Sequence, residues 1–149
     1  VPSPAPQEIP DIRVLRLLLD QGVIVICTGG GGIPVLRLPN GSMTGIEAVI
    51  DKDAASALLA QQLGADALLL LTDVDAVYRG FGTPDEAAIA ELTPDEAITL
   101  DLPAGSMGPK IRAAADFASH GGLAGIGRLD QATAILEKRA GTRIVTDGR

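Results

Sequence analysis

Residues 51–75 read DKDAASALLAQQLGADALLLLTDVD. The alanines and leucines of residues 54–63 recur at helical spacing and Gly64 follows them, so we expect a helix that ends near this glycine. The short, uniformly apolar run Ala67–Leu71 predicts a strand that is buried on both faces. The polar residues 72–75 would then lie at the carboxyl end of that strand.

The same alternation of helical and strand-like segments continues on both sides of this stretch. It predicts an α/β fold, built as a three-layer sandwich around a mostly parallel sheet. Further helices are expected from Asp11 to about Gly22, from Gly105–Lys110 onward and from Asp130 to about Arg139, and further strands at Val23–Cys27, Ala124–Gly127 and Thr142–Val145.

Shorter signals complete the outline of the chain. Residues 1–10 hold four prolines and are predicted to be an extended linker, which leaves residues 11–149 as one folded lobe. Val35–Leu38 and the turn that follows it, with Asn-Gly at its end, predict a β-hairpin. Two identical Thr-Pro-Asp-Glu stretches, at 83–86 and 93–96, each have the capping-box pattern of a helix start.

Composition excludes several classes of function. The 149 residues carry a net charge of -7 and no basic run, which argues against a nucleic-acid partner. Apolar runs are too short to span a bilayer, so no membrane partner is expected. One cysteine and one histidine cannot form a Cys/His zinc site, and a single cysteine fits a protein of the cytoplasm.

The loop after the first predicted strand is Gly29-Gly30-Gly31-Gly32. Ligands of parallel sheets bind at the carboxyl ends of the strands, and four glycines expose N–H groups that can cradle an anion. The loop matches neither a Rossmann fingerprint nor a P-loop. A tight strand exit without ligand is the alternative, and the loop by itself does not decide between them.

Two lysines stand at predicted helix starts, where the helix dipole disfavours a cation. Lys52 lies between Asp51 and Asp53, one of which would cap the helix, and Lys110 closes the stretch Gly105–Lys110. One anionic ligand between the two lysines would offset both costs, and a polyphosphate fits best.

Other polar or reactive residues have plain structural explanations. Thr72 and Asp73 can bond the turning backbone, and Tyr78 can pack either on a base or on the core. Cys27 is most simply a buried strand residue, and His120 a cation at a helix end.

These segments, taken in order, resemble the C-terminal half of the carbamate kinases, which belong to the amino-acid-kinase group. The resemblance covers nearly the whole chain, and the ordered set is more specific than any one motif. Its motifs are Val1–Pro4, Gly29–Val35, Glu47–Asp53, Leu71–Val74, Ala104–Lys110, Leu129–Ala132 and Gly141–Thr142.

The resemblance implies reversible phosphoryl transfer between Mg²⁺-ATP and carbamate by residues 11–149 acting as an ATP-binding lobe. It implies that Lys52 and Lys110 neutralise the phosphates and that Asp53 holds both lysines. Thr72, Asp73 and Tyr78 would line the nucleoside pocket, Met107 and Gly108 would approach the phosphates or base, and Gly29, Gly30, Gly31 and Gly32 would lie on the acceptor side.

Family chains are about twice as long, so the resemblance also implies a missing N-terminal half and a homodimer at full length. We therefore expect exposed apolar surface where that half would pack, and no kinase activity without it. The alternatives are an amino-acid kinase acting on acetylglutamate or aspartate, and a stand-alone nucleotide-binding module without catalysis.

Overall fold

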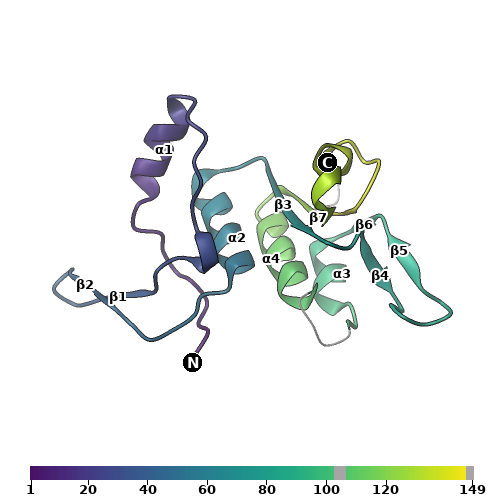
Figure 1. Ribbon diagram of the computed structural model, residues 1–149, viewed down its shortest axis with the longest axis horizontal. Coiled ribbons are helices and arrows are strands. Elements are labelled where there is room, and N and C mark those ends of the chain that lie inside the picture. Colours follow the sequence, from purple (N-terminus) through teal and green to yellow (C-terminus); the bar gives the residue numbers. More distant parts are fainter. Residues whose placement is uncertain (103–106, 147–149) are drawn as a thin grey trace.

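The computed structural model describes residues 1–102 and 107–146, and a four-stranded sheet organises its C-terminal part (Figure 1). The strand order is β3-β7-β8-β6. The pairs β3–β7 and β6–β8 are parallel, and β7–β8 is antiparallel. The α/β class and the mostly parallel sheet are therefore confirmed. The strands are β3 (Ala67–Thr72), β6 (Glu91–Leu92), β7 (Leu123–Arg128) and β8 (Thr142–Ile144).

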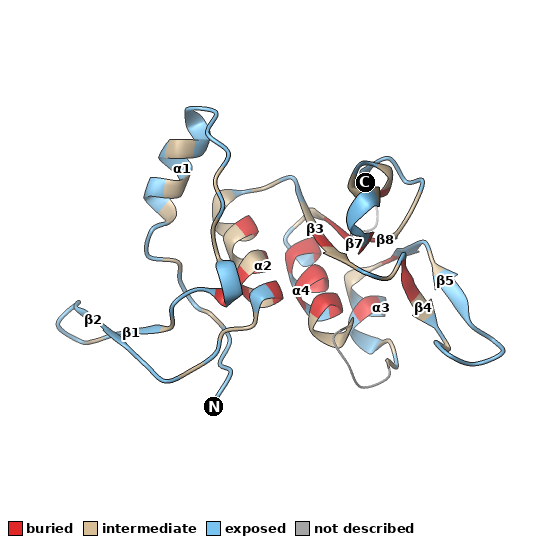
Figure 2. Ribbon diagram, in the orientation of Figure 1, coloured by how far each residue is buried: buried red, intermediate tan, exposed pale blue. Residues whose placement is uncertain are grey.

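Helices cover both faces of this sheet. On one face α4 (Met107–Ser119) packs on β7, with α2 (Lys52–Leu63) and α3 (Pro94–Thr99) against it. Figure 2 shows the buried residues concentrated where α2, α4 and α3 face one another and the sheet. Because the chain has few aromatic residues, this core is mostly aliphatic, with Phe117 as its one aromatic member among the described residues, and alanines let the helices approach closely.

The opposite face is covered by α5 (Ala132–Leu136), which follows the short turn η2 (Leu129–Gln131). Ala124 and Ile126 of β7 belong to the core beneath α4, whereas Gly125 and Gly127 point toward α5. A Cβ atom on Gly125 would lie 2.6 Å from the side chain of Ile135. The glycines of β7 thus make room for α5 on a strand whose other face is filled.

The remaining elements lie toward the two ends of the molecule (Figure 1). A hairpin of β4 (Val77–Arg79) and β5 (Ala87–Ile89) follows β3. The N-terminal part consists of α1 (Ile12–Asp20), the turn η1 (Gly29–Gly31) and a second hairpin of β1 (Val35–Arg37) and β2 (Met43–Gly45). The predicted hairpin and the predicted first helix are therefore both present.

Val23–Cys27 was expected to be a buried strand, and that prediction is wrong. The segment lies in the described part of the chain but pairs with no strand there. Ile24 and Ile26 are 94% and 98% exposed, and Cys27 is only half-buried. The apolar alternation is that of a strand, but the described residues offer it no neighbour. The exposed apolar surface expected from the sequence is present here and on α1, where Val14 and Leu17 are also exposed.

Three smaller predictions also need correction. Within the described residues β3 is an edge strand, so only Leu70 of its residues is buried. Residues 83–86 form a turn between β4 and β5, because the segment after them pairs as a strand, whereas Thr93 does cap α3 with the expected capping box. Asp130 caps no helix, since its carboxylate pairs with Arg128 at 3.0 Å, which lowers the pKa of Asp130.

No helix within residues 1–102 and 107–146 is both long enough and apolar enough to cross a membrane.

Candidate functional site

The connections of the sheet place two helix N-termini at one edge. Helix α2 leads through a short turn into β3, and α4 leads in the same way into β7. Each helix therefore runs antiparallel to the strand that follows it, and its N-terminus lies beside the carboxyl end of that strand. Since β3 and β7 are parallel, both N-termini face the edge where parallel sheets bind ligands.

At this edge two lysines converge on one buried carboxylate. The Nζ atom of Lys110 lies 3.0 Å from Oδ2 of Asp53, and Nζ of Lys52 lies 3.7 Å from the same oxygen. The side chains of Asp53 and Lys110 are only 8% and 7% exposed, whereas that of Lys52 is 62% exposed. Residues from two segments of the chain, with Asp53 and Lys110 57 positions apart, thus form one cluster with an excess of one positive charge.

Of the two aspartates beside Lys52, Asp51 is the one that caps α2. Its Oδ1 accepts hydrogen bonds from the backbone N–H groups of Asp53 at 3.0 Å and Ala54 at 2.9 Å. Asp51 is therefore the N-cap, and Asp53 is released to pair with the lysines. The cap also fixes the first turn of α2, on which Lys52 and Asp53 stand.

The glycine loop packs against the start of the same helix. Gly31 is buried at φ +93°, and a Cβ there would lie 2.0 Å from the carbonyl oxygen of Ile50. Gly30 and Gly32 also have positive φ, whereas Gly29 does not, and a Cβ on Gly29 would meet open space. The loop thus needs glycine for contact with the segment that enters α2, and its other glycines remain exposed or accessible.

The residues expected to line a nucleoside pocket lie at and after the carboxyl end of β3. Thr72 Oγ1 donates to the carboxylate of Asp73 at 3.0 Å. The hydroxyl of Tyr78 donates to Asp75 at 2.8 Å, and this hydrogen bond, with smaller contributions from burial and nearby charge, raises the pKa of Tyr78. Tyr78 also packs edge-on against Phe81, so its ring is held by the hairpin rather than by the core.

Met107 and Gly108 form the first turn of α4, and Met107 packs against the core. A Cβ on Gly108 would come within 3.4 Å of the guanidinium of Arg112. Residues 105 and 106 of the predicted helix start lie outside the described residues.

Thr142 supports the site through contacts that its sequence motif, Gly141–Thr142, does not predict. Its buried hydroxyl accepts a hydrogen bond from the N–H of Val77 at 2.8 Å and donates one to the carbonyl of Ile89 at 2.5 Å. It thereby joins both strands of the β4–β5 hairpin, which holds Tyr78, to β8. The motif Gly141–Thr142 belongs to the family resemblance, but a threonine within a predicted strand gives no sign of this contact.

Known proteins resemble this chain in both sequence and structure. The family model described as "Amino acid kinase family" matches residues 2–126. Proteins named carbamate kinase from Haemophilus influenzae and Escherichia coli K12 are 47% and 48% identical, each over 97% of this chain. A solved structure, carbamate kinase from Giardia lamblia bound to AMP-PNP, matches with a TM-score of 0.93 and 44% identity over 99% of the chain.

The match covers only part of each relative. The chain spans about half the length of the relatives it matches, namely 47% of the Haemophilus protein and 48% of the Giardia structure.

Proposed function

Because this chain belongs to the amino acid kinase family, we propose that it is the nucleotide-binding half of a carbamate kinase. The reaction would be ATP + carbamate = ADP + carbamoyl phosphate, in either direction. An oxygen of carbamate attacks the γ-phosphorus, the bond to the β,γ-bridging oxygen breaks, and ADP leaves with that electron pair. The similarity to several carbamate kinases over nearly the full length of this chain supports this acceptor over other acids.

The cluster of Lys52, Asp53 and Lys110 is the observation that supports the proposal most. Phosphoryl transfer depends mainly on positioning and on stabilisation of the charge spread over the phosphoryl oxygens. Two ammonium groups at two helix N-termini supply that stabilisation, and one carboxylate orients both of them. We assign Lys52 and Lys110 together to neutralising the transferring phosphoryl and the β-phosphate, and Asp53 to positioning the two lysines.

Thr72, Asp73 and Tyr78 would line the nucleoside pocket, and Met107 and Gly108 would approach the phosphates or base. The placement of the first three at and after the carboxyl end of β3, and of the other two at the start of α4, supports this assignment. Gly29, Gly30, Gly31 and Gly32 would lie toward the acceptor, since their loop packs beside the N-terminus of α2.

Magnesium would accompany the nucleotide rather than occupy a site built by these residues. Within the described residues no three acidic, histidine or cysteine side chains are grouped as metal ligands. Asp51 is engaged as a helix cap and Asp53 by two lysines. Mg²⁺ commonly keeps waters and phosphate oxygens as ligands, which fits this arrangement.

The remaining half of the enzyme would pack on the exposed apolar surface. Ile24 and Ile26 present an unpaired extended segment, and Ile33 is 88% exposed beside the glycine loop. An edge of this kind favours strand addition by a partner. We propose that the N-terminal half of the same enzyme covers it and completes the carbamate site, that the complete protein is a cytoplasmic homodimer, and that this half alone is inactive.

The test is calorimetric titration of the chain with Mg²⁺-ADP. Lys52→Ala should weaken binding by about tenfold, as expected for loss of a charge-assisted contact, and Lys52→Ala with Lys110→Ala should abolish it. Arg13→Ala, which removes an exposed cation on α1 away from this cluster, is the control and should bind as the wild type does. Equal binding by the wild type and the double variant, both folded, would refute the site.

A further inference from the structure

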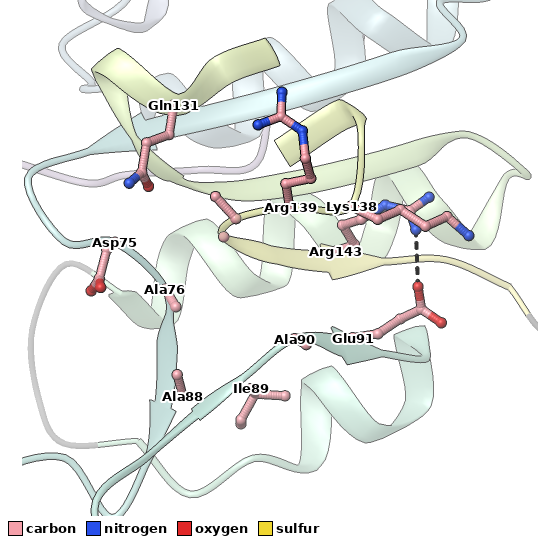
Figure 3. A pocket seen from close by; sticks show the side chains of 12 residues that line it. Asp75, Ala76, Ala88, Ile89, Ala90, Glu91, Gln131, Lys138, Arg139 and Arg143 are labelled. Carbon is pink, nitrogen blue, oxygen red and sulfur yellow. Dashed lines mark hydrogen bonds and ion pairs between the residues drawn. The ribbon is translucent and has the colours of Figure 1, made fainter. Parts of the chain in front are cut away.

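A cavity lies between the β4–β5 hairpin, β6 and the loop that joins α5 to β8 (Figure 3). Its volume is about 460 Å³, within the range of small-molecule pockets. None of Lys52, Asp53 and Lys110 lines it. It adjoins the predicted nucleoside region at Asp75 and at Ala88, the strand partner of Tyr78, but none of Thr72, Asp73 and Tyr78 lines it.

Arg143 is the clearest sign that this cavity takes a ligand. Its side chain is only 8% exposed, and its Nη1 donates to Glu91 at 3.0 Å, drawn as a dashed line in Figure 3. Its Nε–H is buried and has no hydrogen-bond partner among the described residues. A buried donor without an acceptor is costly, and a ligand oxygen in the cavity would remove that cost.

Lys138 adds an unpaired charge at the same wall. Among the described residues it makes no ion pair, although its neighbour Arg139 pairs with Glu137. Lys138 also adopts the left-handed conformation, with φ of 62°, just after the C-cap of α5. Glycine is the usual residue at that position, because it has no Cβ, so a lysine there is not explained by local stability.

The charges on the cavity wall favour a monoanion over a dianion. Glu91 pairs with Arg143, and Arg139 pairs with Glu137. Two opposite charges remain, those of Lys138 and Asp75, because the hydrogen bond from the neutral hydroxyl of Tyr78 does not cancel the charge of Asp75. The wall therefore has no excess of positive charge that could compensate a phosphate dianion, whereas a single carboxylate can pair with Lys138 alone.

The rest of the cavity wall is small and apolar. It consists of Ala76, Ala88, Ile89, Ala90 and Ala140. Such a wall suits a short aliphatic body.

We propose that this cavity binds a small aliphatic carboxylate, with the carboxylate between Arg143 Nε and Lys138 and the hydrocarbon against the alanines. The proposal does not depend on the kinase assignment, because it uses none of the residues of the phosphate cluster. The site also adjoins the turn that holds Asp75, so an occupant would contact the segment that positions Tyr78.

The experiment is an NMR titration of the folded, isotope-labelled chain with butyrate at constant ionic strength, following the amides of Ala76 and Ala140. Butyramide, which has the same shape without the charge, and inorganic phosphate are the comparison probes. Butyrate should cause saturable chemical-shift changes. Butyramide should bind with an affinity at least roughly tenfold lower, because a charged hydrogen bond is lost. Equal response to butyrate and butyramide, or a stronger response to phosphate, would overturn the proposal.

Variants at Lys138 separate binding from stability. Lys138→Gly relieves the left-handed strain and should raise the melting temperature, yet it should weaken butyrate binding by about two- to fivefold, as for an exposed charge. Lys138→Arg should retain binding. Arg13→Gln, which removes an exposed cation on α1 at the opposite end of the molecule, should leave binding unchanged. If Lys138→Gly binds butyrate as tightly as the wild type, Lys138 has no part in the site and the proposal fails.

Discussion

The ion pair between Asp53 and Lys110 permits a prediction with a worked magnitude. At 3.0 Å and an effective dielectric constant of about 20, two unit charges attract by about 5.5 kcal/mol. Both side chains are buried, so desolvation costs several kcal/mol for each ion and largely cancels the attraction. The intact pair therefore contributes little to the free energy of unfolding, but removing one partner leaves the other as an unpaired buried charge.

The single variants Asp53→Asn and Lys110→Met should each lower the free energy of unfolding by about 3–5 kcal/mol. Asp53→Asn should be the worse of the two. It leaves Lys110 buried beside another cation, whereas Lys110→Met leaves Asp53 with Lys52 at 3.7 Å. The double variant should cost less than the sum of the singles, with a coupling energy of about 3 kcal/mol or more.

Urea unfolding followed by circular dichroism measures all four free energies. The exposed pair Arg37–Glu8, at 2.7 Å, is the matched control, and its double-variant cycle should give a coupling below about 1 kcal/mol. If the Asp53–Lys110 coupling is as small as that of the control, the pair is not buried in solution. The assignment of Asp53 as the group that positions both lysines would then fail.

Three further predictions concern the supports of the site. Gly31→Ala should disrupt the glycine loop, because its Cβ would collide with backbone at positive φ, while Gly29→Ala should be tolerated; thermal unfolding of both variants compares them. The hydrogen bond to Asp75 raises the pKa of Tyr78, so Asp75→Asn should lower that pKa toward its ordinary value. Any stability from this bond is present below the unfolded pKa of about 10 and is lost as pH rises through the folded pKa. Tyr78 is the only tyrosine and there is no tryptophan, so phenolate absorbance reports it alone, and an unchanged titration midpoint would contradict the bond. Thr142→Val should destabilise the chain by about 1–3 kcal/mol by leaving two buried backbone groups unpaired, and Thr142→Ser should restore most of this; equal stability of the two variants in urea would show that the hydroxyl is not the cause.

The parts of the fold that the sequence predicts correctly depend on neighbours close in the chain. The start of α2 is set by Asp51, and its end by Gly64 in the left-handed conformation, both within the helix itself. The identical Thr-Pro-Asp-Glu stretches show the limit of such signals. Thr93 is followed by a segment that buries Ala97 against α4, so α3 forms. The copy at residues 83–86 is followed by β5, which pairs with β4 instead.

Predictions from the sequence fail where a strand depends on pairing with a segment that is distant in the chain. Val23–Cys27 and Ala67–Leu71 are equally apolar and equally short. The second becomes β3 because α4 brings β7 beside it, while the first finds no partner among the described residues. An apolar run thus indicates that a segment has apolar surface to bury, but it does not indicate which other segment pairs with it.

The two lysines illustrate how far a local electrostatic argument reaches. Their positions at helix starts suggested an anionic ligand, yet the structure supplies a protein carboxylate that already matches one of them. Asp53 alone would explain Lys110. It does not explain Lys52, which is mostly exposed, stands at a second helix N-terminus and shares the same carboxylate at the longer distance of 3.7 Å. Because one carboxylate cannot neutralise two ammonium groups and two helix dipoles, the case for a bound polyphosphate depends on Lys52, and its substitution is the sharper test of the site.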